Sequence, residues 1–137
     1  MRQFLVRSLS GQGVEFGAGC RPYSVPIGCK VSYADRFSDD EMLNRSSSAR
    51  KELQDTDIFM PIDVVDEFDE MANFSDESVD FVLAAHVIEH VAEAIGAFET
   101  AYRVLRPGGK LVLAIPDIKR TRDRSRSVTP IQHLLAD

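Results

Sequence analysis

Short apolar segments alternate along this chain with segments of helical periodicity, and this alternation limits the fold more than any other feature. Residues 12–16, 30–34, 57–65, 79–85 and 110–115 have the length and composition of buried strands. Strands separated by helices favour parallel pairing with right-handed crossovers. The sequence therefore predicts an α/β fold with a doubly wound, mostly parallel sheet of about five strands.

Two of the segments between these strands carry clear helix signals. Ser38 is followed three residues later by Glu41, the spacing of a capping box, which predicts a helix running to about Leu53. Apolar residues recur at helical spacing over residues 87–105 and predict an amphipathic helix. The run Arg106-Pro-Gly-Gly109 is expected to end that helix before the last strand.

Prolines mark the remaining connections. Pro22 and Pro26 lie in the short stretch between the first two strands, which predicts a connection that is mostly loop. Pro61 restricts the third strand to an edge or a bulge of the sheet. Thr129-Pro130 predicts the start of a last short helix.

Length and composition predict one domain over residues 1–137, with a core at 12–117 and a basic tail at 118–137. The chain is 44% hydrophobic and 28% charged, which argues against intrinsic disorder. It has neither an apolar run of membrane-spanning length nor a signal-peptide pattern. We therefore expect no membrane partner. The two cysteines, Cys20 and Cys29, do not form a disulfide framework, so we expect a cytoplasmic protein.

Charge is unevenly distributed along the sequence. The first 116 residues contain 19 acidic and 11 basic residues, a net charge of −8. Such an acidic body repels phosphates and argues against nucleic acid as a partner. Residues 117–137 have a net charge of +2, with five basic residues between Lys119 and Arg126. This basic run is either a solvated face or a site for an anionic group of a ligand.

Glycines and an acidic residue stand at the ends of the first two predicted strands. Gly17 and Gly19 allow a sharp turn and a close approach of a ligand to the backbone. Asp35 ends the second strand 18 residues after Gly17, where a carboxylate can accept hydrogen bonds from a ribose diol. Ligands of doubly wound sheets bind at the carboxyl ends of the strands, so the sequence predicts a nucleotide-type site there.

Several motifs resemble those of class I S-adenosylmethionine-dependent methyltransferases. They are Glu15-x-Gly17-x-Gly19, Asp35, Ser78-Val-Asp80-Phe, Ile88-Glu-His-Val91 and, most specific, Arg103-Val-Leu-Arg-Pro-Gly-Gly109-Lys-Leu. The resemblance covers roughly residues 12–117 and is closest to the small methyltransferase domains found beside glycosyltransferases. It implies a Rossmann-like methyltransferase fold shortened at its C-terminus, with S-adenosylmethionine as cofactor.

The resemblance also implies roles by position. Gly17 and Gly19 would line the methionine moiety of the cofactor, Asp35 would hold the ribose hydroxyls, and His86 would border the sulfonium. The full set of residues implied to bind the cofactor is Glu15, Gly17, Ala18, Gly19, Asp35, Arg36, Asp66, Glu67, Phe68, Ala85 and His86. Arg21 would add a positive charge at the mouth of the site, toward the cofactor carboxylate or an anionic substrate.

The activity that this resemblance implies is methyl transfer to a small-molecule or glycan acceptor by in-line displacement. A sulfonium methyl group is already activated, so the protein mainly aligns the acceptor. If the acceptor is a hydroxyl or an amine, a base helps as its proton leaves. His86 is the first candidate for that base and His133 the second, whereas His90 is expected to be structural.

Two alternatives remain open on the sequence alone. His86-x-x-Glu89-His90 matches the H-x-x-E-H motif of inverted zinc peptidases. We nevertheless expect no metal site in this chain and keep zinc hydrolysis only as a remote alternative. Full-length methyltransferases of this class usually continue with two more strands, so the chain could be an inactive cofactor-binding or scaffold protein without an acceptor-binding half. An exposed edge on the last strand also predicts a homodimer.

Overall fold

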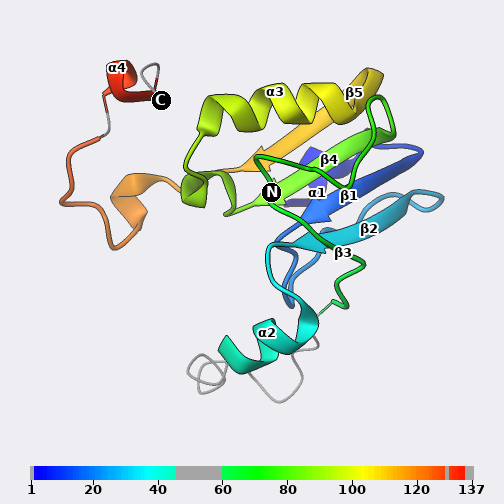
Figure 1. The fold of residues 1–137 in the computed structure, drawn as a ribbon, viewed down its shortest axis with the longest axis horizontal. Helices are drawn as coiled ribbons and strands as arrows, with labels where there is room; N and C mark the ends of the chain where they lie inside the picture. Colours follow the sequence, from blue (N-terminus) through cyan, green and yellow to red (C-terminus); the bar gives the residue numbers. More distant parts are fainter. Residues whose placement is uncertain (1, 46–59, 129, 135–137) are drawn as a thin grey trace.

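A computed structural model describes residues 2–45, 60–128 and 130–134 of the chain. Its strands form one sheet in the order β3-β2-β1-β4-β5, and every neighbouring pair is parallel (Figure 1). The strands are β1 (Gln12–Phe16), β2 (Lys30–Asp35), β3 (Val64–Val65), β4 (Val79–Ala85) and β5 (Leu105–Ala114). The predicted Rossmann-like, parallel α/β sheet is therefore confirmed.

The described parts of the chain also contain short helical segments. They are α1 (Arg2–Val6), α2 (Asp39–Arg45), the 3-10 turn η1 (Ile88–His90), α3 (Ala94–Val104), the 3-10 turn η2 (Ile118–Arg120) and α4 (Ile131–Leu134). No helix separates β1 from β2, as the short connection with two prolines predicted. Among the described residues, no helix combines the length and the apolar composition needed to cross a membrane.

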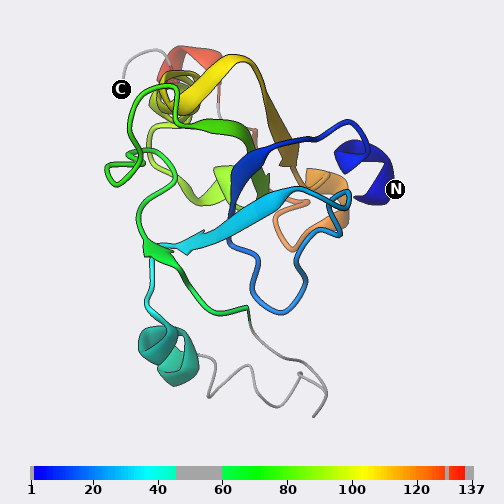
Figure 2. The same ribbon diagram turned by 90° about the vertical axis from the view of Figure 1, so that its right-hand side faces the viewer.

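Strand β4 is apolar throughout its buried length because both faces of the sheet are covered there. Val82 and Ala84 pack with the α3 side of the core, whereas Phe81 and Leu83 pack on the opposite side with Val6 of α1. Figure 2 shows α3 and α1 on opposite sides of the sheet. Alternate residues of one strand thus enter two different clusters, which is the reason for a continuous apolar run.

The predicted helix over residues 87–105 is wrong in its first turns. Residues 88–90 form the single 3-10 turn η1, and the α-helix starts only at Ala94. Ile88 is nevertheless buried, and Val87 and Val91 pack against the same cluster. A 3-10 turn can bury such residues as well as an α-helix does, so apolar spacing alone did not distinguish the two.

Other element boundaries also differ from the sequence expectation. The third strand is assigned only at Val64–Val65, and residues 57–59 of its predicted range lie outside the described residues. The last strand begins at Leu105, and its register against β4 shifts between Val79 and Phe81. The Arg106-Pro-Gly-Gly109 run does end α3, but it forms an irregular start of β5 rather than a separate loop.

The capping box at Ser38 is present. The backbone N–H of Ser38 donates to Glu41 Oε2 at 2.9 Å, and the N–H of Glu41 donates to Ser38 Oγ at 3.4 Å. These reciprocal bonds satisfy amides that an uncapped helix would leave open. The predicted end of this helix near Leu53 lies outside the described residues, which stop at position 45.

Candidate cofactor site

A cavity of about 680 Å³ lies at the carboxyl ends of the strands. Its wall comes from residues 16–17 at the end of β1, 35–37 at the end of β2, 66–70 after β3, and 86–87 and 90–92 after β4. Strand order reverses between β1 and β4, which are neighbours in the sheet but not in the sequence. Ligands of doubly wound sheets bind at such a point, and the volume is typical of a small-molecule site.

Gly17 lines this cavity in a backbone conformation that only glycine adopts easily. Its φ is +66°, and its N–H donates to the carbonyl of Ala34 at 3.0 Å. A Cβ placed at Gly17 would lie 2.8 Å from Cγ2 of Val87. The end of β1 therefore passes so close to the segment after β4 that no side chain fits between them.

Glu15 is buried beneath the loop that follows Gly17. The side chain is 1% exposed, and both carboxylate oxygens accept from the backbone N–H of Tyr23 at 3.1 Å. The carboxylate thus fixes the connection between β1 and β2. Of the residues expected at the cofactor, Glu15, Ala18, Gly19 and Ala85 lie at these strand ends but outside the cavity lining.

Asp35 lines the cavity at the end of β2. Its Oδ1 accepts from the N–H of Phe37 at 3.2 Å. Burial raises the pKa of the Asp35 carboxyl above its usual value, and hydrogen bonds from the backbone of Phe37 and Arg36 oppose that rise. The carboxylate is therefore held in an environment that disfavours its charge and gains from any donor brought into the cavity.

The loop after β3 is organised by Asp66, which accepts three backbone hydrogen bonds. Oδ1 accepts from Glu67 at 2.9 Å and Ala72 at 3.1 Å, and Oδ2 accepts from Asn73 at 2.8 Å. Phe68 is buried and meets the ring of Phe16 edge-on, with centroids 5.3 Å apart. The structure places both Asp66 and Phe68 in the cavity wall, and both also shape the loop itself.

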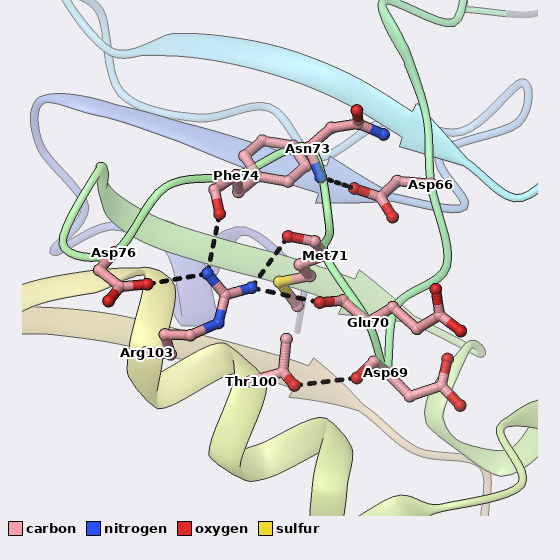
Figure 3. Close-up of polar contacts among 9 residues, drawn as sticks. All are labelled: Asp66, Asp69, Glu70, Met71, Asn73, Phe74, Asp76, Thr100 and Arg103. Atoms are coloured by element: carbon pink, nitrogen blue, oxygen red, sulfur yellow. Dashed lines mark hydrogen bonds and ion pairs between the residues drawn. The ribbon is translucent and has the colours of Figure 1, made fainter.

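Helix α3 holds the same loop from its other side (Figure 3). Nη1 of Arg103 donates to the carbonyl of Phe74 at 2.9 Å and to Oδ1 of Asp76 at 3.0 Å. Nη2 donates to the carbonyls of Glu70 at 3.2 Å and Met71 at 3.0 Å. A planar guanidinium suits such a fork of acceptors, so the first residue of the Arg103-Val-Leu-Arg motif connects α3 to the cavity loop.

An ion pair joins the segments that follow β2 and β3. Nη2 of Arg36 lies 3.1 Å from Oε1 of Glu67, and both residues line the cavity. The Arg36 guanidinium also lies 5.3 Å from the centroid of the Phe37 ring. Arg36 and Glu67 therefore lie together in the cavity wall, in a pairing that the sequence did not predict.

His86 follows β4 directly and has the left-handed φ of +59°, which is uncommon for a residue with a side chain. Its N–H donates to the carbonyl of Ala114 at 2.9 Å, which ties the ends of β4 and β5 together. Nδ1 lies 3.3 Å from Oε1 of Glu89, and the imidazole is 65% exposed. Residues in strained conformations are held by their surroundings and gather at functional sites.

His90 was expected to be structural, but it is exposed and lines the cavity together with His86. The sequence also gave no signal for Phe37, Val87 and Val91 as wall residues. Phe37 lies between β2 and α2, whereas Val87 and Val91 flank η1, the short turn after β4 that contributes His90 to the same wall. The only sequence signal for a site in this segment was the end of a strand followed by two histidines.

The geometry does not support the zinc interpretation. His86 precedes η1, and residues 88–90 form one 3-10 turn, so His86 and His90 do not share the face of an α-helix. In the part of the chain that the structure describes, no group of three His, Cys, Asp or Glu side chains could hold a metal ion. Glu89 is instead the partner of His86.

The remaining sequence candidates are not among the residues that line this cavity. His133 belongs to α4, and its side chain is outside what the structure describes. Arg21 is exposed in the β1–β2 connection. Cys20 and Cys29, also in that connection, are free and half-buried.

Three features surround the cavity at the strand-order reversal: a glycine turn, a carboxylate at the end of β2 and an acidic loop. Together they define a Rossmann-like cofactor-binding domain. The methyltransferase domain family matches residues 23–113, which is more than half of the chain. The chain therefore belongs to the methyltransferase domain family.

Solved structures with the same fold are S-adenosylmethionine-dependent methyltransferases. A protein from Thermotoga maritima, named as a possible histamine N-methyltransferase, is 29% identical, with a TM-score of 0.56 over 85% of this chain and 50% of its own. An arsenic(III) S-adenosylmethionine methyltransferase from Chlamydomonas reinhardtii is 22% identical, with a TM-score of 0.53 over 79% of this chain and 38% of its own. A protein from Methanococcus maripaludis, named as a putative S-adenosylmethionine-dependent methyltransferase, is 18% identical, with a TM-score of 0.53 over 77% of this chain and 48% of its own.

This chain thus spans about half the length of these structures or less. No curated protein matches the sequence.

The family implies S-adenosylmethionine as the cofactor, and the residues of the cavity fit it. Gly17 contributes only backbone to the cavity wall, so a ligand there meets no side chain from this position. Asp35 supplies a half-buried acceptor for hydroxyl donors. The wall contains five carboxylate residues, Asp35, Asp66, Glu67, Asp69 and Glu70, against the single arginine Arg36. This negative lining suits a cofactor that carries a sulfonium and an ammonium group.

Proposed function

We propose that the chain transfers a methyl group from S-adenosylmethionine to a small-molecule or glycan acceptor. The observation that carries this proposal is the cavity at the β1–β4 reversal, where Gly17, Asp35 and His86 meet. Membership in the methyltransferase family supports the reaction class. The preference for a glycan or other small acceptor rests on the sequence resemblance.

The bound cofactor supplies an activated methyl group, and the protein's own residues position the partners. Asp35 accepts hydrogen bonds from the ribose hydroxyls, and the Gly17 turn lets the backbone approach the methionine part. The gain from such positioning can reach roughly 7–11 kcal/mol of activation free energy. The acceptor is aligned from the side of the strand ends, where His86 borders the cavity.

His86 is proposed as the base that takes the acceptor proton. Oε1 of Glu89 lies 3.3 Å from Nδ1 of His86, and the nearby negative charge favours the tautomer with the proton on Nδ1. Nε2 is then left as the proton acceptor. Glu89 acts here as a positioning residue, because it contacts the imidazole and not the reacting atoms.

Calorimetric titration with S-adenosylmethionine and S-adenosylhomocysteine tests the proposal. We expect binding to the wild type and a loss of about ten- to hundredfold in affinity for Asp35→Ala, since the carboxylate contributes charged hydrogen bonds. Asp40→Ala, an equal charge change on α2, should bind normally. Folded wild-type protein that binds neither compound would contradict the proposal and favour a scaffold role.

The proposal extends to assembly and location. Strand β5 is the last strand of the described sheet and offers its outer edge to another chain. We propose that two copies associate through this edge to form a homodimer. The low cysteine content is consistent with a cytoplasmic protein.

A further inference from the structure

A strongly basic stretch follows β5 at the same edge of the sheet as the cavity. Residues 117–126, here called the basic segment, contain five basic and two acidic residues. Figure 1 shows η2, the start of this segment, beyond the carboxyl ends of β4 and β5. The preceding 116 residues have a net negative charge, so a positively charged segment beside the cavity calls for an explanation.

The basic segment is built from hydrogen-bonded turns. Asp117 Oδ1 accepts from the N–H of Lys119 at 3.0 Å, and its carbonyl accepts from Arg120 at 2.8 Å. Thr121 Oγ1 donates to the carbonyl of Ile118 at 2.9 Å. Farther along, the carbonyl of Asp123 accepts from the N–H of Arg126 at 2.8 Å. These turns hold several cationic side chains on a short length of ordered backbone.

Chain geometry keeps the basic segment near the proposed base. The carbonyl of Ala114 accepts from the N–H of His86, so the end of β5 is fixed beside the cavity. Lys119 lies five residues farther along, and a fully extended chain of that length spans at most about 18 Å. A ligand of modest size can therefore reach both His86 and the basic segment.

The charged side chains of this segment are exposed, and most of its cations are not engaged in ion pairs. Arg126 pairs with Asp123 at 3.0 Å. Within residues 2–45, 60–128 and 130–134, no ion pair is formed by Arg120, Arg122 or Arg124. Four of the five cations are arginines, whose planar forks bind phosphate oxygens in pairs.

The cavity itself could not take an anionic acceptor group. Its wall holds five carboxylate residues and one arginine, and that arginine is paired with Glu67. A phosphate placed there would meet like charge, whereas the sulfonium cofactor is attracted. An acceptor with a phosphate would have to keep that group outside the cavity, toward the basic segment.

We propose that the basic segment binds a phosphate group of the methyl acceptor, which is therefore a phosphorylated small molecule or glycan. This inference rests on the proposed function and narrows its substrate class. Arg120, the last residue of η2, and Arg122, two residues farther along, would form the main phosphate contacts. The phosphate would anchor the acceptor while its reacting atom faces His86.

The test is a titration of the isotopically labelled full chain, saturated with S-adenosylhomocysteine, followed by NMR at low ionic strength. The probes are glucose 1-phosphate, glucose and a short single-stranded RNA. We expect glucose 1-phosphate, but not glucose, to shift the amide signals of residues 117–126. The double variant Arg120→Gln/Arg122→Gln should bind glucose 1-phosphate at least about tenfold more weakly.

A matched control separates a local site from net charge. Arg7→Gln/Lys30→Gln removes the same charge near the amino ends of β1 and β2 and should leave glucose 1-phosphate affinity unchanged. Equal weakening by both double variants, or no binding to the wild type, would overturn the inference. RNA binding at these residues that is tighter than binding of the sugar phosphate would also overturn it, in favour of a nucleic-acid surface. Normal S-adenosylhomocysteine binding in these cases would leave the proposed function intact.

Discussion

Asp35 illustrates at the scale of one residue how a binding site can lower the stability of its own fold. Burial raises the pKa of this carboxyl, so the folded state favours its protonated form more than the unfolded state does. Any stabilisation from this group is present in acid and is lost as pH rises through the raised pKa. At neutral pH the charged side chain therefore opposes folding.

Asp35→Asn should consequently raise the melting temperature at neutral pH while it weakens cofactor binding. The stability difference from the wild type should shrink as pH falls toward the ordinary carboxyl pKa of 3.8. Wild-type affinity for S-adenosylhomocysteine should decline over the same fall in pH, because the acceptor becomes protonated. Thermal unfolding and calorimetry across this range measure both effects, and a variant less stable than the wild type at neutral pH would contradict the argument.

Gly17 is a second site residue whose local geometry affects the stability of the fold. Gly17→Ala should destabilise the protein by about 2–3 kcal/mol, since it combines a left-handed backbone with a close contact. Gly19→Ala shares the positive φ of +55° but meets no atom within 4 Å, so about 1 kcal/mol is expected. Denaturant unfolding of both variants tests this, and equal losses would show that the contact with Val87 is unimportant.

At the scale of elements, the acidic loop after β3 depends on α3. Arg103→Lys keeps the positive charge but loses the fork that reaches the Phe74, Glu70 and Met71 carbonyls. We expect a loss of about 1–3 kcal/mol in stability and weaker S-adenosylhomocysteine binding. Hydrogen exchange should accelerate at the amides of Met71 and Asn73, which are bonded within the loop.

Arg106→Lys is the matched control for that variant. Arg106 forms an ion pair with Asp80 at 3.1 Å, at the opposite end of β4 from the cavity. Its replacement should leave cofactor affinity and loop exchange unchanged. If Arg106→Lys accelerated exchange in the loop as much as Arg103→Lys does, the effect of Arg103 would be one of general stability.

Secondary structure could be predicted from sequence where the pattern of buried residues fits only one type of element, either a strand or a helix. Residues 81–85 of β4 are apolar on both faces, the pattern of a strand that is covered on both sides. Residues 87–93 were wrongly predicted as helix, because Ile88 and Val91 are buried at spacings that a 3-10 turn also allows. The spacing of apolar residues shows which of them are buried. Whether residues 87–93 form an α-helix or a 3-10 turn depends on how they pack against the sheet.

Some residues of the candidate site could likewise be predicted from sequence, and others could not. Gly17, Asp35 and His86 could be proposed because each ends a strand, and parallel strands bring their ends to one edge. The pairing of Arg36 with Glu67 and the entry of His90 into the cavity wall could not. Those contacts depend on how two loops approach each other across the sheet, which no local pattern encodes.

At the scale of the whole molecule, charge separates two regions along one edge of the sheet. The cavity wall is acidic, and the basic segment follows the neighbouring strand β5. A cationic cofactor and an anionic acceptor group would then be attracted to different places, with the reacting atoms between them. This separation would orient the acceptor even though the described sheet ends at β5.

The free edge of β5 leads to a last prediction, on assembly. An unpaired strand edge exposes N–H and C=O groups that can pair with a second chain. We expect light scattering to show a dimer whose fraction rises with protein concentration. Amides in residues 105–114 should become more protected from hydrogen exchange over the same concentrations, whereas β1, already paired on both sides, should not change. A monomer at every concentration would rule out the dimer, and dimerisation without new protection in β5 would place the interface on another surface.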